Sequence, residues 1–310
     1  MFYIERTFMD RKKEITGHVF ALISIFIWGT TFISTKILLE AFSPIEILFL
    51  RFTIGFAVLL AVYPHRLKVK ERKQELYFAA AGLCGITLYY LLENIALTYT
   101  FASNVGVIIS IAPFFTAIFA HLFLDGEKLR AQFFIGVVVA VVGIFLISFN
   151  GSSNLQLNPL GDILAVLAAV VWAGYSILTK KISGFHYNSI QSTRRTFFYG
   201  LVFMIPALFI FGFKPNVNQI IQPINLFHIL FLGFGASALC FVTWSLAVKI
   251  LGAVKTSVYI YLVPVITVVT SVIVLSERIT GVMAFGILLT LAGLFISGLK
   301  TSAKQKEIKK

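Results

Sequence analysis

One acidic side chain lies inside a long apolar stretch, where a charge is costly and needs a reason. Glu93 is followed by Asn94, and mostly apolar residues flank the pair. A carboxylate in such surroundings can bind and release a proton, or bind the ammonium group of a substrate. The alternative is a structural ion pair with Arg51 or Lys36, which we expect at similar depth on neighbouring segments. Both interpretations stay open at this point.

Two basic side chains also lie within apolar stretches. Arg51 can in principle meet a carboxylate or a phosphate, but Arg195 recurs at the corresponding position of the second half of the chain. This recurrence favours a shared structural role. Lys36 lies near the end of its apolar run, where a long side chain reaches the interface. We therefore consider Lys36 and Arg51 candidates for structural ion pairs.

Two prolines, Pro113 and Pro264, fall in the middle of apolar runs that correspond between the two halves. Proline removes a backbone donor and bends a helix, which exposes carbonyl groups that can line a cavity. A static kink that only improves packing is an equally good explanation. Interrupted segments at corresponding positions nevertheless predict a binding site near the membrane midplane.

Aromatic and polar side chains near that depth are candidates for the walls of such a cavity. Aromatic residues are also common at lipid-facing positions, so we expect about half of them to line it. Together with Glu93 and Asn94, the candidate residues for coupling or substrate contact are Trp28, Thr31, Trp172, Tyr175, Trp244, Tyr259 and Tyr261.

No pattern in the sequence indicates a nucleotide, a metal or a catalytic group. We find no Walker loop, no cluster of metal ligands and no Ser/His/Asp set on a common face. Cys84 and Cys240 lie inside apolar runs and indicate small buried side chains rather than a disulfide. We therefore expect no cofactor, no metal and no enzymatic activity.

The composition places these residues in a membrane. Of the 310 residues, 58% are hydrophobic and 13% are charged, and the mean hydropathy is +0.92. Soluble domains carry about 25% charged residues. The formal net charge of +13 does not indicate a nucleic-acid partner, because nearly all Lys and Arg residues lie in short breaks between apolar runs.

These apolar runs predict helices, because strands of a membrane barrel alternate in polarity. About 20 apolar residues cross a bilayer. The predicted spans are 17–38, 45–63, 76–98, 101–124, 131–149, 161–182, 190–213, 226–249, 255–275 and 280–299. With the N-terminus inside, 22 of the 26 Lys and Arg residues fall in inner segments and two in outer ones. This asymmetry predicts that both termini are cytoplasmic.

The two halves of the chain resemble each other. At an offset of 144 residues, Trp28 matches Trp172, Lys36 matches Lys180 and Arg51 matches Arg195. At an offset of 151, Gly82 matches Gly233, Ala96 matches Ala247, Ala102 matches Ala253 and Pro113 matches Pro264. At an offset of 150, Glu127 matches Glu277, Gly136 matches Gly286 and Gly143 matches Gly293. Each unit holds five spans, so the second unit must enter the membrane inverted. Inverted-topology repeats are typical of secondary transporters.

The expected fold is an all-α integral membrane protein of ten transmembrane helices in two five-helix inverted-topology repeats. We divide the chain into an N-terminal cytoplasmic segment (1–16), a first repeat (17–149), an extracytoplasmic linker (150–160), a second repeat (161–299) and a basic cytoplasmic tail (300–310).

The sequence also resembles the EamA-type members of the drug/metabolite transporter superfamily over about residues 17–299. The resemblance rests on Trp28-Gly29, Ser43-Pro44, Arg51-Phe52, Glu93-Asn94-Ile95-Ala96-Leu97, Ala112-Pro113, Glu127 and Gly136, with Trp172, Ala247, Pro264, Glu277, Gly286 and Gly293 in the second half. One departure is that Trp244 occupies the repeat position of Glu93. The resemblance implies a ten-helix carrier that exports small metabolites.

We therefore expect a secondary transporter in the bacterial cytoplasmic membrane that moves small metabolites, such as amino acids, by alternating access and with proton coupling as one option. A passive channel or lipid translocator is the first alternative, and a membrane-embedded enzyme is the second. The expected partners are a small-molecule substrate and membrane lipid, with no nucleic acid. Five plus five helices can enclose a pathway in one chain, so both a monomer and a homodimer are compatible with the sequence.

Overall fold

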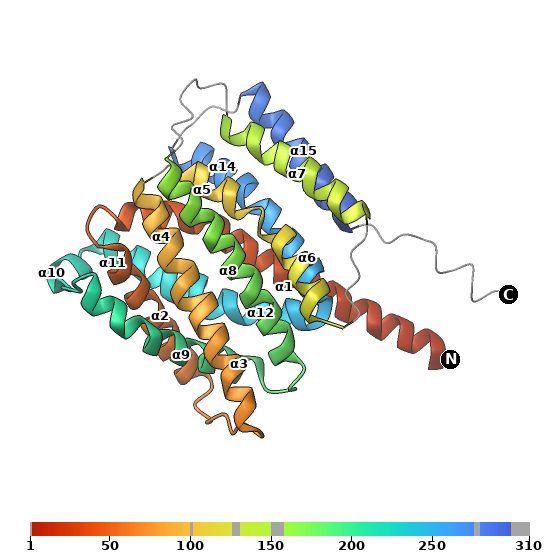
Figure 1. Cartoon of the computed structure of the whole chain (residues 1–310), viewed down its shortest axis with the longest axis horizontal. Coiled ribbons are helices and arrows are strands. Elements are labelled where there is room, and N and C mark those ends of the chain that lie inside the picture. Colours follow the sequence, from red (N-terminus) through yellow and green to blue (C-terminus); the bar gives the residue numbers. More distant parts are fainter. Residues whose placement is uncertain (1, 100–101, 126–130, 150–157, 276–279, 299–310) are drawn as a thin grey trace.

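The computed structural model describes residues 2–99, 102–125, 131–149, 158–275 and 280–298, and all regular elements in these ranges are helical (Figure 1). By length and composition, six helical segments of the described part can cross a membrane. Four shorter apolar helices accompany them: Ala112–Phe123, Ala131–Leu146, Ala253–Thr267 and Ala284–Ser297. The chain is therefore an all-helical, multi-pass membrane protein, whereas the count of ten spans and the orientation of the termini stay predictions.

The first half begins with a helix that is longer than its apolar run. Helix α1 starts at Phe2 rather than at the predicted residue 17, because charged residues such as Glu, Lys and Arg are good helix formers outside the membrane. The elements of this half are α1 (Phe2–Leu38), α2 (Pro44–Val62), α3 (Arg72–Gly82), the π-helical segment η1 (Leu83–Leu88), α4 (Tyr89–Tyr99), α5 (Ala102–Ile109), α6 (Ala112–Phe123) and α7 (Ala131–Phe149).

The second half follows a similar order. It contains α8 (Pro159–Ser183), α9 (Ser189–Ile210), the short α10 (Val217–Ile220), α11 (Pro223–Leu230), the π-helical segment η2 (Phe231–Leu239), α12 (Cys240–Leu251), α13 (Ala253–Ser257), the 3₁₀ turn η3 (Val258–Tyr261), α14 (Leu262–Leu275) and α15 (Gly281–Gly298). Sequence reasoning did not predict α10. The predicted linker lies mostly, and the predicted tail entirely, outside the described residues, as do Glu127 and Glu277.

Two spans that the sequence predicts as plain helices contain π-helical segments. Segment η1 joins α3 to α4, and η2 joins α11 to α12. In a π-turn the hydrogen bond reaches one residue further, and such turns are frequent at functional sites. Gly85 in η1 shows the reason for a small residue here: a Cβ atom at this position would lie 2.2 Å from the ring of Tyr175.

Two other spans are broken near their prolines. Helix α5 ends at Ile109 and α6 begins at Ala112, so that Pro113 is the second residue of the new helix. In the second half, η3 precedes α14, and Pro264 is the third residue of α14. Each proline thus stands in the first turn of a helix, where its missing N–H costs little. The interruption lies on the N-terminal side of the proline.

Helices α7 and α15 pack against each other along one edge of the molecule (Figure 1). Glycines make this close approach possible: a Cβ atom at Gly143 would lie 2.5 Å from the backbone nitrogen of Thr290, and one at Gly293 would lie 2.4 Å from that of Ala140. Small residues at such crossings are typical of helix pairs in membranes. The remaining helices form the main body, in which α8 contacts α3, α4, α5, α6 and α12.

Candidate binding cavity

All three tryptophans of the chain meet in the centre of the main body. Trp28 on α1 lies 5.3 Å from Trp172 on α8 and 5.1 Å from Trp244 on α12, measured between ring centroids. Phe241 lies 5.7 Å from Trp28 and Tyr175 lies 5.0 Å from Trp172. We call these five side chains the aromatic layer. Such tilted and edge-on contacts stabilise aromatic pairs.

Hydrogen bonding within the aromatic layer is incomplete. The indole N–H of Trp28 donates to the backbone oxygen of Ala236 at 2.9 Å. The indole nitrogens of Trp172 and Trp244 are buried and have no hydrogen-bond partner among the described residues. Buried donors are usually satisfied, so each such exception needs an explanation. A polar ligand or water in an adjoining cavity would supply one.

A small cavity of about 40 Å³ adjoins this layer. Its polar and aromatic walls come from α1, α4 and α8, and its apolar walls include the end of α5 and the start of α14. The lining residues are Trp28, Thr31, Tyr89, Tyr90, Glu93 and Trp172, with Ile25, Phe32, Ile109, Ile260 and Val263. Both interrupted spans therefore contribute to one central cavity.

Glu93 is the carboxylate of the central cavity. Its side chain is 5% exposed, and its Oε2 atom has no hydrogen-bond partner among the described residues. Neither Arg51 nor Lys36 forms an ion pair with it in the described part of the chain. The polar groups that act on it are the hydroxyl of Tyr89, one turn earlier on α4, and the more distant guanidinium of Arg51.

The expected ion pairs of Lys36 and Arg51 are replaced by other contacts. Lys36 is exposed and donates to the backbone oxygen of Leu97 at 3.3 Å. Arg51 is 2% exposed; its Nε donates to Ser237 Oγ at 3.1 Å, and its guanidinium lies 4.3 Å from the ring centroid of Tyr90. Its Nη2 atom has no partner among the described residues. Aromatic faces, rather than a carboxylate, stabilise this buried cation.

Four of the predicted cavity residues, Trp28, Thr31, Glu93 and Trp172, line the central cavity. The other candidates lie elsewhere. Asn94 donates from Nδ2 to the backbone oxygen of Pro44 at 3.2 Å and thereby joins α4 to the start of α2. The hydroxyl of Tyr259 contacts the ring of His18. Tyr261 belongs to a separate apolar cluster that includes residues of α7, and its hydroxyl has no partner among the described residues.

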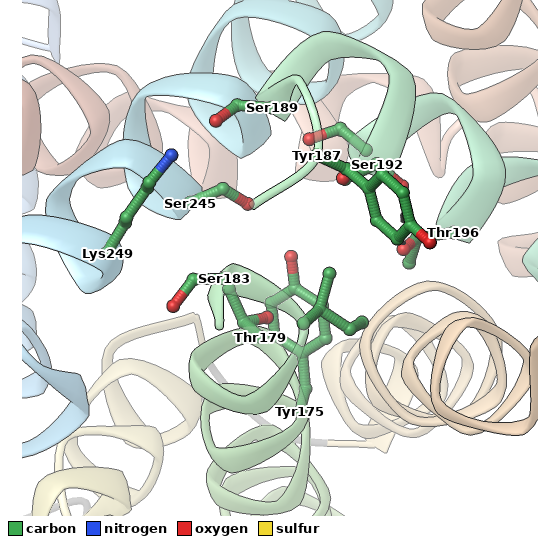
Figure 2. Close-up of a pocket in the computed structure, with 11 residues that line it drawn as sticks. Tyr175, Thr179, Ser183, Tyr187, Ser189, Ser192, Thr196, Ser245 and Lys249 are labelled. Carbon is green, nitrogen blue, oxygen red and sulfur yellow. Dashed lines mark hydrogen bonds between the residues drawn. The ribbon is translucent and has the colours of Figure 1, made fainter. Parts of the chain in front are cut away.

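Tyr175 lines a second cavity of about 30 Å³, between α8, α9 and α12. We call it the hydroxyl vestibule; Figure 2 shows hydroxyl groups from three helices facing a common space, with Lys249 at one side. It is lined by Tyr175, Thr179, Ile182, Ser183, Tyr187, Ser189, Ser192, Thr193, Thr196, Ser245 and Lys249. Sequence reasoning missed this site, because its Ser and Thr residues are spread over three helices and form no motif.

Tyr89 and Tyr90 of the central cavity were also missed. A signal existed, since Tyr89 lies four residues before Glu93 and therefore on the same side of the helix. For Ser237, the partner of Arg51, no comparable signal exists, because it lies 186 residues away in the chain. Among the described residues, no group of three or more His, Cys, Asp or Glu side chains could hold a metal ion.

The counterpart of Arg51 in the second half has a carboxylate partner. Arg195 on α9 binds both carboxylate oxygens of Glu75 on α3, with Nε to Oε2 at 3.1 Å. The hydroxyl of Tyr199 donates to the same Oε2 atom at 2.8 Å. These side chains are partly exposed at the end of the bundle. Arg195 thus fastens α9 to α3.

Known transporters resemble this chain over nearly its whole length. The profile of the EamA-like transporter family matches residues 15–149 and 159–299. An uncharacterized transporter of Archaeoglobus fulgidus is 29% identical over 294 residues, which are 94% of this chain and 98% of that protein. A probable terminal-alkyne amino-acid exporter of Streptantibioticus cattleyicolor is 27% identical over 95% of this chain and 97% of its own length. A crystal structure with 20% identity shares the fold, with a TM-score of 0.72 over 95% of this chain and 99% of the other.

Proposed function

Because the chain belongs to the EamA-like transporter family, and is thus a transporter and not an enzyme, we propose that it is a secondary active exporter of small metabolites, amino acids or related compounds. Its site of action is the bacterial cytoplasmic membrane. The observation that carries the proposal is Glu93: a buried carboxylate without an ion-pair partner among the described residues, in a cavity that both interrupted spans adjoin.

The proposal includes alternating access. The central cavity of about 40 Å³ is far smaller than the roughly 300–1,000 Å³ of a typical small-molecule site. Its walls must therefore separate before a metabolite enters. Ten spans in two inverted repeats, with both termini in the cytoplasm, provide equivalent gates on the two sides. One chain surrounds the cavity, which supports a monomer as the transporting unit.

Glu93 has two candidate roles in this cycle: proton coupling and direct binding of a substrate ammonium group. The aromatic rings of Trp28 and Trp172 around the cavity support the second role, since aromatic faces attract cations. The amino-acid substrate that the name of the Streptantibioticus relative states also supports a cationic amine in this cavity.

A transport assay tests the proposal and separates the two roles. Purified protein in liposomes is supplied with a labelled amino-acid mixture, and gradient-driven uptake and counterflow are measured with and without an imposed pH gradient. We expect Glu93→Gln to abolish the response to the gradient. If Glu93 couples protons, counterflow persists in this variant; if it binds the substrate amine, counterflow is lost as well.

Glu40→Gln is the matched control, because Glu40 is exposed in the turn after α1 and undergoes the same chemical change. We expect this variant to retain both activities. An unchanged rate and pH dependence in Glu93→Gln would contradict the proposed role of Glu93. Flux that neither saturates nor shows counterflow would instead indicate a channel or a lipid translocator.

A further inference from the structure

The hydroxyl vestibule contains a buried hydrogen-bonding group with no use in the fold. Thr193 on α9 lines it and is 3% exposed, yet its hydroxyl has no hydrogen-bond partner among the described residues. A buried unsatisfied hydroxyl destabilises the protein unless something occupies the site. This orphaned group suggests a ligand that the vestibule receives.

Other hydroxyls of the vestibule have structural partners and serve as its frame. Tyr187 donates to Gln74 Oε1 at 2.6 Å and accepts from the backbone N–H of Lys70 at 2.8 Å. Thr196 donates to the backbone oxygen of Ser192 at 3.1 Å. These bonds hold the parts of the vestibule wall that precede and follow Thr193 in the chain.

The charge in the vestibule determines which ligand it suits. Among the described residues that line it, Lys249 carries the single charge, and it forms no ion pair with a described carboxylate. Hydroxyl donors beside one ammonium group match a carboxylate or a phosphate oxygen. The ammonium group of Lys249, which is exposed to solvent, attracts an anion and repels a cationic group.

Tyr175 joins this polar cavity to the central one. Its hydroxyl faces the vestibule (Figure 2), near the side chains of Thr179 and Ser245. Its ring packs on Trp172, which lines the central cavity three residues earlier on α8. The aromatic layer therefore separates the two cavities. Within it, the hydroxyl of Tyr175 faces the vestibule, and its ring contacts Trp172, a residue of the central cavity.

We propose that the hydroxyl vestibule is a second binding site, in which Lys249 and Thr193 hold the anionic group of a small solute beside the Tyr175 side of the aromatic layer. Its place on a transport path rests on the proposed function. The binding itself does not, because it needs no turnover.

Protection of a cysteine tests this site without a known substrate. Ser245→Cys is introduced after Cys84→Ser and Cys240→Ala, and its reaction with the neutral reagent N-ethylmaleimide is timed in the full-length protein. Ser245 is half-buried in the vestibule wall. We expect acetate to slow the reaction progressively and methylammonium to leave it unchanged. Equal effects of the two ions, or none, would overturn the proposal.

Two further substitutions assign the protection to the residues named. Lys249→Gln should raise the half-protecting acetate concentration about fivefold, the effect of one nearby charge in hydrated surroundings. Thr193→Val should raise it about tenfold, as expected for a hydrogen bond to a charged group. Thr193→Val removes an unpartnered hydroxyl, so elution as a folded species on size exclusion should not change. Lys180→Gln is the control, because Lys180 follows the lining residue Thr179 on α8 but does not itself line the vestibule. In this variant acetate should protect the cysteine as fully as before.

The source of the anion is settled by changing the probe. Inorganic phosphate and acetate are compared in liposomes of phosphatidylcholine, and protection by either supports the site while their relative potency names the preferred group. Protection that comes from phosphatidylglycerol without added anion would assign the site to lipid and overturn its role for solutes. Acetate protection in a protein that shows no counterflow would keep this site and reject the transport function.

Discussion

Arg51 and Arg195 occupy equivalent positions in the two halves of the chain, yet they have opposite surroundings. Arg195 binds the carboxylate of Glu75 near the end of the bundle and remains partly exposed. Arg51 is 2% exposed and contacts Ser237 and the ring of Tyr90, with one nitrogen lacking a partner among the described residues. The repeat therefore preserves the residue while its environment changes.

This difference separates a fastening role from a functional one. A partly exposed, bidentate ion pair holds two helices together and can be lost at modest cost. A buried cation without a carboxylate partner lowers the stability of the folded protein. Its presence therefore favours a functional role for the charge. Arg51 packs against the ring of Tyr90, and Tyr90 lines the cavity that contains Glu93. The difference between Arg51 and Arg195 therefore indicates that the first half of the chain supplies the charged groups of the central cavity.

The largest expected effect comes from replacing the buried cation. Arg51→Met keeps most of the volume but removes the positive charge that acts on Glu93. We expect transport of the amino-acid mixture to fall at least about tenfold, which corresponds to about 1.4 kcal/mol. The amount of folded protein should stay the same, because no described carboxylate loses its partner and Met removes a charge that is costly to bury.

The comparison is made with Arg195→Met, the same change at the equivalent position. Here we expect transport within about twofold of the parent, because Arg195 lies outside both cavities. Equal losses of transport in the two variants would show that the arginines share one role, which is the interpretation that the repeat alone favours. Liposome uptake, normalised to folded protein, decides between these outcomes.

The sequence predicted elements more reliably than contacts. Apolar runs predicted the helical segments, whereas the orientation that the loop charges predicted stays a prediction. Trp28 and Trp172, matched only as repeat positions, lie 5.3 Å apart, a contact that the sequence did not predict. Depth along a helix, however, does not fix rotation about its axis, and this is why Arg51 and Glu93 seemed suited to an ion pair that does not form. The π-turns and the hydroxyl vestibule were also missed, because an extra residue in a turn and scattered Ser and Thr residues leave no periodic pattern. The family resemblance, in contrast, is confirmed over both halves.

A second comparison sets glycines of the two π-helical segments against each other. A Cβ atom at Gly85 would lie 2.2 Å from the ring of Tyr175, which is itself held against Trp172. At Gly235 the nearest atoms would lie at an ordinary 3.6 Å. Gly85→Ala should therefore destabilise the protein by about 1–3 kcal/mol through overpacking. Gly235→Ala should be neutral or stabilising by up to about 1 kcal/mol.

The stability of both glycine variants is measured by thermal unfolding in detergent, with size exclusion as the readout of the folded fraction. Gly85→Ala should also perturb the emission of tryptophan, because the displaced ring of Tyr175 contacts Trp172 and all three tryptophans lie in the aromatic layer. An unchanged spectrum together with unchanged stability would mean that Tyr175 moves freely. It would then be unsuited to separate the two cavities.

The smallest expected effect concerns the ion pair between Arg195 and Glu75. In a double-mutant cycle, Glu75→Gln and Arg195→Gln should show a coupling energy of about 1 kcal/mol in stability, near the upper limit for exposed ion pairs, because the contact is bidentate and Tyr199 supports it. The control cycle pairs Arg195→Gln with Glu40→Gln, because Glu40 is an exposed residue in the turn after α1. Distant sites are additive within about 0.5 kcal/mol. If the coupling energy between Glu75 and Arg195 is also within about 0.5 kcal/mol, the ion pair does not hold α3 to α9. The contrast between Arg195 and Arg51 would then rest on their difference in burial alone.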